Sequence, residues 1–354
     1  MKMQIWIFTF AAFCLFQLVE TAVQCEQKNV TVELPATSPN MSCTTYSIGT
    51  WLCWKKGTQF RANKVLYLTI HGFTYDHTYW SFPYQSPKYS YVDYVIENSN
   101  GRVVVLNIDR LGVGLSSKPL LATDVTIDSN AHVIYHLTKK LYERAFQNVR
   151  FRNIVLVGHS LGTVISWRVA SDPNYNQYIK GLIATGFLHV LNPIGLAAFL
   201  ASFYPAQLDP KFSLQSIPVN YLTTNPFIEI GRLLFYKTDN ADPNVIDQDE
   251  QLKQTGTASE ISTVAAVLQP NVTQMIPDRI PVLAVIGQYD FFGCDASSTN
   301  LSCNGSAAII AREQSYYSYP IEAYVLSNSG QSSNLHLNAR DWYEQALEWT
   351  QRYF

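Results

Sequence analysis

The chain has 354 residues, which suffices for one large α/β domain with an inserted segment or for two ordinary domains. It carries 25 Lys and Arg against 27 Asp and Glu, only 15% of its residues are charged, and no long run has a single sign. This charge pattern excludes the class of nucleic-acid-binding proteins, which concentrate basic residues on one surface.

The first 24 residues are predicted to be a secretory signal peptide. An uncharged run extends from Met3 to Val19 behind a single lysine and ends at Glu20, and cleavage is expected within a few residues of Ala22. A membrane anchor is the alternative, but the run is short and its flank does not resemble a stop-transfer segment. The sequence therefore predicts a secreted, extracellular protein with no transmembrane anchor after leader removal.

Short apolar runs dominate the chain beyond this leader. From about residue 28 to 60, the pieces NVTVEL and YSIGTWLCW predict antiparallel edge strands. Four runs then end in glycine-containing turns and are typical of buried parallel strands: KVLYLTI before HGF, RVVVLNI before DRLGVG, NIVLV before GHSLG, and PVLAVI before GQYD. Amphipathic helices such as TIDSNAHVIYHLTKKLYERAF separate them, and a strand IEAYVL and a helix from about Asn338 close the pattern. This alternation predicts a doubly wound, mostly parallel α/β sheet.

The alternation stops between residues 189 and 277. An apolar stretch, LNPIGLAAFLASFYPAQL, is followed there by a polar stretch rich in Asn, Asp and Gln. We interpret this segment as an inserted helical cap over the carboxyl ends of the strands. The cap would divide the core into a first part, residues 25–188, and a second part, residues 278–354.

Sequons and cysteines also favour a secreted glycoprotein. Beyond the leader the cysteine count is odd, so at least one thiol is unpaired. A local disulfide between Cys294 and Cys303 is predicted, whereas the pairing of Cys25, Cys43 and Cys53 stays open. Five Asn-x-Ser/Thr sequons are candidate glycosylation sites: Asn29, Asn40, Asn271, Asn300 and Asn304.

The stretch NIVLVGHSLGTVISWRVA joins a strand, a tight turn and a helix without a break. This is the context that a G-x-S-x-G nucleophile elbow requires, with Ser160 as the nucleophile. The turn is too tight for side chains at Gly158 and Gly162, and it holds the serine at a helix N-terminus that favours developing negative charge.

A nucleophilic serine needs a base that accepts its proton and an acid that orients the base. The backbone N–H groups of Phe73, in the HGF turn, and Leu161 are the candidate oxyanion hole. Asp290 follows the strand beyond the cap and is the candidate acid. Asp295 is the alternative, although it adjoins Cys294 in the cysteine-bounded loop.

With these motifs in this order, the chain from about residue 60 to 354 resembles the α/β-hydrolase fold family, in the manner of secreted serine esterases and lipases. The resemblance implies a Ser, His, Asp relay in which Ser160 attacks the substrate and Asp290 holds the imidazole. Family members with Asp as the nucleophile, the dehalogenases and epoxide hydrolases, do not fit Ser160.

The chain departs from the family at the catalytic histidine. Many relatives carry Gly-His after the last strand, and the matching residues here are Gly330 and Gln331. A neutral glutamine cannot act as the base at pH 7. His336 is the one histidine after Asp290, so it is the candidate base if the loop swings it into the site.

Several other polar residues are assigned no chemistry. His71 is expected to brace its loop, and Asp109 to tie the DRLGVG turn together through Arg110. His132 and His136 are spaced like zinc ligands, but no third ligand is evident, and neither a metal nor a cofactor is predicted.

The predicted function is therefore a secreted serine hydrolase that cleaves carboxylic esters through an acyl-enzyme on Ser160. The apolar cap segment from Leu191 to Phe203 favours a lipophilic small-molecule ester as the partner. Two alternatives stay open: a binding protein that kept the fold and lost its base, and a lyase that uses the same triad.

Overall fold

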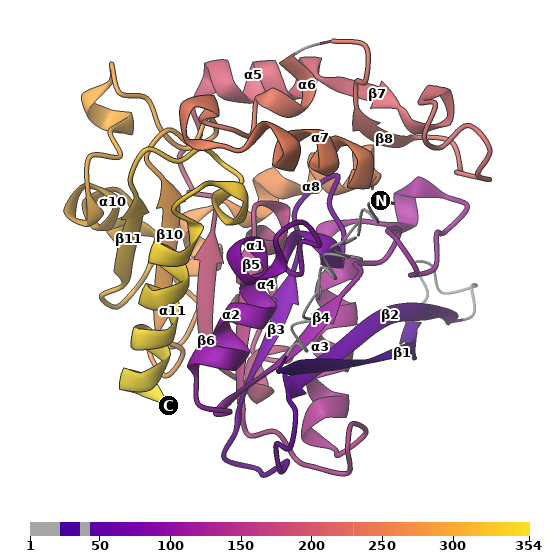
Figure 1. Ribbon diagram of the computed structural model, residues 1–354, viewed down its shortest axis with the longest axis vertical. Helices are drawn as coiled ribbons and strands as arrows, with labels where there is room; N and C mark the ends of the chain where they lie inside the picture. The colour runs from indigo at the N-terminus through magenta and orange to yellow at the C-terminus, as the bar shows by residue number, and fades with distance from the viewer. Residues whose placement is uncertain (1–21, 36–42, 229) are drawn as a thin grey trace, which may run out of the picture.

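The computed structural model describes residues 22–35, 43–228 and 230–354, so most of the predicted leader and the sequon at Asn40 lie outside the described residues. Its core is an eight-stranded sheet with the order β1-β2-β4-β3-β5-β6-β10-β11 (Figure 1). The pairs β1·β2 and β2·β4 are antiparallel and the others are parallel. The mostly parallel sheet and the antiparallel edge strands are therefore as predicted, and the strands are β1 (Val23–Leu34), β2 (Thr44–Lys55), β3 (Val65–Ile70), β4 (Val103–Ile108), β5 (Asn153–His159), β6 (Ile179–Thr185), β10 (Val282–Gly287) and β11 (Glu322–Leu326).

Helices cover both faces of the sheet, as a doubly wound fold requires. The strands β3, β4 and β10 are buried along their whole length, which explains their continuous apolar sequences. α3 begins after a Thr126 capping box and buries the face that the sequence predicts. The helices of the core are α1 (Ser86–Tyr89), α2 (Tyr91–Asn98), α3 (Ile127–Tyr142), α4 (Leu161–Ser171), α10 (Ser306–Glu313) and α11 (Ala339–Tyr353).

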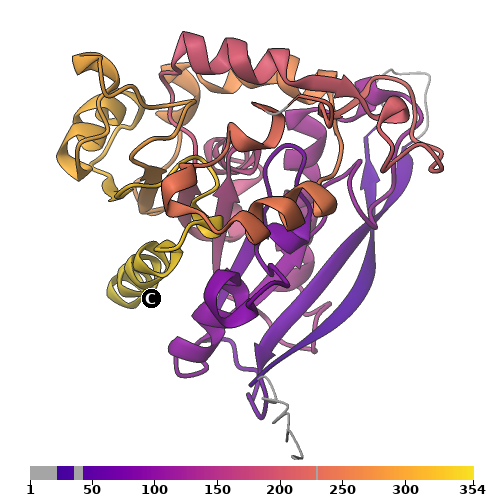
Figure 2. The ribbon, with the colours of Figure 1, turned by 45° about the horizontal axis from the view of Figure 1, so that its top comes forward.

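The chain between β6 and β10 folds over the carboxyl ends of the parallel strands, where it forms the upper layer in Figures 1 and 2. This segment is mostly helical, but it also contains a small antiparallel sheet of three strands. Its elements are α5 (Pro193–Ala201), β7 (Phe203–Pro205), β8 (Tyr221–Thr224), α6 (Ile230–Leu233), α7 (Pro243–Leu252), β9 (Gly256–Thr257), α8 (Ala258–Val267) and α9 (Pro270–Thr273).

Two disulfides tie the chain together. Cys294 and Cys303 form the local bond that the sequence predicts. Cys25 and Cys53 form the other, because the β1·β2 register places them opposite one another. Cys43 is an exposed free thiol.

The structure describes the end of the predicted leader and four of the five glycosylation sequons. β1 begins at Val23, one residue after Ala22, so the predicted leader boundary at residue 24 falls just inside this strand. Four of the five sequon asparagines are described, and all four are exposed. No described helix combines the length and the apolar character that a membrane span needs.

Candidate active site

Ser160 occupies a sharp turn between β5 and α4, with φ 53° and ψ −117°. A Cβ added at Gly158 would lie 2.5 Å from the Gly162 carbonyl oxygen, and one added at Gly162 would overlap the Ile70 carbonyl. Sterics therefore impose both glycines of GHSLG. The left-handed serine costs on the order of 1 to 3 kcal/mol, and the Ser160 N–H donates a hydrogen bond to the Thr185 carbonyl at 2.8 Å, which holds the turn.

The HGF turn that follows β3 packs directly against this elbow. A Cβ added at Gly72 would lie 3.0 Å from the Ser160 Cβ, so a larger residue would crowd the serine and glycine favours this close approach of the two segments. Phe73 and Leu161 line the same cavity as Ser160. The structure thus brings together the three residues that the oxyanion-hole hypothesis requires.

Asp290 lies in the turn after β10 and is fully buried. Its Oδ1 accepts hydrogen bonds from the N–H groups of Phe292 at 2.8 Å and Gly293 at 3.2 Å. Among the described residues its Oδ2 has no partner. Burial raises the pKa of Asp290 to about 7, although the two N–H groups and the Arg312 guanidinium oppose the shift. The buried carboxyl group thus has one oxygen free for a donor.

We expect Asp290→Asn to stabilise the protein more at pH 8 than at pH 5. The pKa of Asp290 is raised on folding, so the folded state holds a proton that the unfolded state releases, and this group's contribution to stability falls as pH rises toward 7. The asparagine does not titrate. Urea unfolding of both proteins should show a difference on the order of 2 kcal/mol between the two pH values, and a pH-independent difference would contradict the raised pKa.

Gln331 is buried where the carboxyl ends of the central strands meet. Its backbone carbonyl oxygen would lie 3.3 Å from a Cβ added at Gly186, just past β6. Its side-chain amide lies next to His159, at the end of β5, and tends to raise the pKa of that imidazole. That contact is not a well-formed hydrogen bond, because both amide atoms of Gln331 lack a partner of good geometry among the described residues. Burial nevertheless lowers the pKa of His159 to about 3. The position at which the family resemblance leads one to expect the base is thus occupied by a buried, neutral amide.

His336 is fully buried, and main-chain groups engage both of its ring nitrogens. Nδ1 donates to the Ser332 carbonyl at 2.9 Å. Nε2 accepts from the N–H groups of Gly330 and Lys237, each at 3.0 Å. Burial lowers the pKa of His336 to about 4. No hydrogen bond in the described chain joins His336 to Ser160, so in this arrangement the imidazole fastens the turn after β11 to the cap and is not placed as the base.

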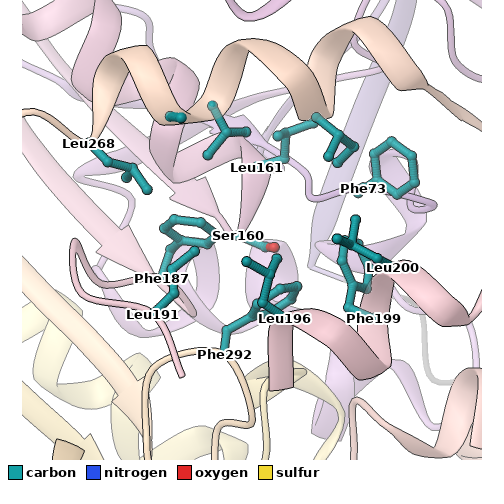
Figure 3. Close-up of a pocket in the computed structure, with 13 residues that line it drawn as sticks. Phe73, Ser160, Leu161, Phe187, Leu191, Leu196, Phe199, Leu200, Leu268 and Phe292 are labelled. Atoms are coloured by element: carbon teal, nitrogen blue, oxygen red, sulfur yellow. The ribbon is translucent and has the colours of Figure 1, made fainter. Parts of the chain in front are cut away.

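A cavity of about 250 Å³ lies above Ser160, whose hydroxyl is directed into it (Figure 3). Ser160 is the one residue with a polar side chain among those that line it. The segment from Leu191 to Phe203 contributes four lining residues, Leu191, Leu196, Phe199 and Leu200. The sequence indicated this segment but not α8. The three- and four-residue spacing of the α8 side chains was the available signal. The lining consists of Phe73, Ser160, Leu161, Phe187, Leu191, Leu196, Phe199, Leu200, Ile261, Val264, Ala265, Leu268 and Phe292.

The cap also reaches the oxyanion loop through a buried ion pair that the sequence analysis did not identify. Arg232 donates to the two carboxylate oxygens of Asp249, each at 2.7 Å, and to Thr74 Oγ1 at 2.8 Å. Thr74 directly follows Phe73 and has a φ of 59°, which is rare for a β-branched residue. The cap therefore holds a strained residue next to the candidate oxyanion donor. The available signal was an arginine within the apolar stretch IGRLLFY.

His71 and Asp109 both stabilise the loops in which they lie. His71 braces its loop as expected, because its Nε2 accepts from the Arg110 N–H at 3.0 Å. Asp109 does tie its turn together, but through the Leu115 N–H at 2.8 Å, whereas the Arg110 side chain pairs with the buried Glu260 of α8. Glu260 is a cap residue 150 positions away along the chain, so the sequence did not indicate it as a partner.

The histidine pair on α3 and the alternative acid lie outside this site. The Nε2 atoms of His132 and His136 are 2.9 Å apart, and among the described residues no third His, Cys, Asp or Glu joins them at ligand distance. Asp295 accepts hydrogen bonds from Ser297 within the disulfide loop.

The sequence matches the Alpha/beta hydrolase family over residues 67–346. No curated protein matches it. Solved structures of similar fold include a soluble variant of monoglyceride lipase from Saccharomyces cerevisiae in complex with a substrate analog, at 15% identity, 96% of this chain, 98% of that chain and a TM-score of 0.59. A carboxyl esterase from Bacillus coagulans is 13% identical, with 93% of this chain and 98% of that chain covered and a TM-score of 0.57. Tomato methylketone synthase I in complex with 2-tridecanone is 11% identical, with 82% of this chain and 99% of that chain covered and a TM-score of 0.55.

Proposed function

The chain belongs to the alpha/beta hydrolase family. On this premise we propose that it is a member with an incomplete triad, which lacks the base and binds lipophilic carboxylic esters and their acyl products at Ser160. The observation that carries the proposal is the cavity, which is apolar except for the serine at its floor. An acyl chain would displace water from this lining, while the carbonyl carbon would lie at the hydroxyl. The lipase and esterase of similar fold agree with this ligand class.

On this proposal the site would supply a nucleophile and an oxyanion hole but no base for proton transfer. The Ser160 hydroxyl would attack the carbonyl, and the N–H groups of Phe73 and Leu161 would stabilise the oxyanion. The proton of the hydroxyl then needs an acceptor, and the Gln331 amide is not basic. With Asp290 Oδ2 unpartnered, the acid has no imidazole to orient. Binding is therefore favoured over turnover.

A turnover-competent esterase is the second candidate function. The strained φ of Ser160 and the two sterically required glycines favour it, because this geometry exposes a nucleophile at an energetic cost. Labelling with a fluorophosphonate separates the two candidates. Rapid phosphonylation of Ser160 in the wild-type protein would establish an activated serine and select the esterase.

We also propose that the protein is secreted. The uncharged run from Met3 to Val19 supports this proposal, and so do the two disulfides, because such bonds persist in oxidising compartments. Expression of the full chain in a eukaryotic host should yield extracellular protein that begins near Ala22, as N-terminal sequencing would show. Retention of the intact leader on a cell-associated protein would contradict secretion.

Affinity should rise with acyl-chain length until the cavity is full. Each buried methylene contributes about 0.8 kcal/mol, so isothermal titration with a series of saturated fatty acids should show an increase of about fourfold per carbon. A plateau is expected where further carbons no longer enter the cavity. Affinities that do not depend on chain length would contradict binding within the apolar lining.

A matched pair of variants on α8 locates the ligand. Ala265 lines the cavity and Ala266 does not, although both are exposed positions of the same helix. Ala265→Trp should fill the cavity and weaken binding by at least about tenfold, because the ligand loses apolar contact area. Ala266→Trp should leave the affinity unchanged. Equal affinities for both variants would place the ligand elsewhere.

A further inference from the structure

The outer side of the cap exposes large apolar side chains around an uncharged helix. Between Lys180 and Asp209 the sequence contains no Asp, Glu, Lys or Arg. α5 lies in this interval, and its Ile194 side chain is 78% exposed. An exposed helix of a soluble protein ordinarily carries charge on its outer face, and α5 does not. Its outward surface is therefore unusual in composition.

Neighbouring cap segments extend this apolar surface. In the connection between β7 and β8, Leu214 is fully exposed, and in the turn after β8, Phe227 is 67% exposed. Both figures show α5 and β7 in the upper layer of the cap, away from the central sheet, with the connection between β7 and β8 at the edge of that layer. We call this surface the apolar ridge and define it by the exposed residues Ile194, Leu200, Leu208, Leu214, Val219 and Phe227.

The apolar ridge is continuous with the cavity above Ser160. Leu200 belongs to both, because it lines the cavity and is 45% exposed to solvent. Leu196, one turn before Leu200 on the same face of α5, and Phe199 line the same cavity. One uncharged helix thus separates the outer apolar surface from the apolar interior, so a lipophilic molecule that leaves a surface touching α5 would cross little polar surface before it enters the cavity.

The charge of the cap indicates whether a neutral or an anionic surface would bind the apolar ridge. Among the described cap residues, Asp209, Asp249 and Glu260 are buried in ion pairs. The charged cap residues that are not buried are four acidic ones, Asp239, Asp242, Asp247 and Glu250, and two basic ones, Lys211 and Lys237. An anionic surface would be repelled by this balance, whereas a neutral one would not. We propose that the apolar ridge docks on a neutral, zwitterionic lipid surface, from which the cavity takes up its ligand. This rests on the proposed function only for the identity of the ligand, because docking itself needs no chemistry at Ser160.

Vesicle flotation tests the docking directly. The full-length mature protein should float with phosphatidylcholine vesicles, and added phosphatidylserine should not increase the bound fraction. The triple variant Ile194→Asn, Leu214→Ser, Phe227→Ser should lower the partition coefficient by at least about tenfold, because three inserted apolar side chains are lost. None of the three residues lines the cavity. The control is Tyr353→Ser, an exposed aromatic residue at the C-terminal end of α11, on the far side of the molecule from α5 (Figure 1), which should bind vesicles as the wild type does.

Fatty-acid titration without vesicles distinguishes failure of this inference from failure of the proposed function. Normal titration by the triple variant together with lost flotation supports the docking surface. Unchanged flotation of the triple variant, or flotation that requires phosphatidylserine, overturns it and leaves the proposed function standing. Absence of flotation with a concentration-dependent dimer in gel filtration also overturns it, in favour of a second copy of the chain. If the wild type floats but binds no fatty acid, the proposed function fails and the docking surface stands.

Discussion

Replacing Gln331 with histidine should raise kcat/KM for a short-chain p-nitrophenyl ester by about two to four orders of magnitude, the range that a positioned general base contributes. The buried side chain at 331 lies where the central strands end, and the free Oδ2 of Asp290 is available to accept a hydrogen bond from an imidazole. The new base would remove the Ser160 proton and complete the relay. The rate of p-nitrophenol release by purified wild-type and Gln331→His proteins provides the measurement.

Two controls make this result specific. Gln331→Asn changes the same buried position without adding a base, so its rate should stay at the wild-type level. Adding Ser160→Ala to Gln331→His should return the rate to background, because the nucleophile is lost. A wild-type rate already equal to that of Gln331→His would show that the chain obtains its base from another residue.

His336→Ala should destabilise the protein by about 3 kcal/mol or more. The change leaves the N–H groups of Gly330 and Lys237 and the Ser332 carbonyl without their partner, and each unsatisfied buried group costs about 1 to 3 kcal/mol. Ester hydrolysis per folded molecule should change little, because no hydrogen bond in the described chain joins His336 to Ser160. Urea unfolding and the esterase assay, made on the same preparations, measure the two effects.

The opposite pattern would restore His336 as the general base. A loss of about three orders of magnitude in kcat with a stability change below about 1 kcal/mol is what removal of a triad member produces. His132→Ala is the matched control, because His132 is a partly exposed residue of α3 and lies outside the turn after β11. It should alter both quantities only slightly.

Local chemistry explains the parts of the site that were predictable. The elbow follows from sterics within five consecutive residues, since no side chain fits at Gly158 or Gly162. The Cys294–Cys303 disulfide spans nine positions of one polar loop. The buried strands can be recognised in the sequence because a strand that is covered on both faces must be apolar throughout.

Contacts between distant segments explain the parts of the structure that the sequence did not predict. The role of His336 depends on the Lys237 N–H, 99 positions away in the cap, and a partner at that separation leaves no pattern in the sequence. Cys25 could be paired with Cys53 only once the β1·β2 register was known. The α8 side of the cavity likewise arises from folding of the cap over the sheet, because the Arg110–Glu260 ion pair joins the two across 150 positions.

The sequence by itself determined the sheet, the sharp turn at Ser160 and the absence of histidine at position 331, because strand burial, turn sterics and side-chain identity are local properties. Only the tertiary structure decided that His336 is held by three main-chain groups, that Asp290 keeps a free oxygen and that the space above Ser160 is apolar. Whether a titratable group acts as a base depends on which atoms surround its nitrogens and at what distance, and the folded chain alone fixes those positions.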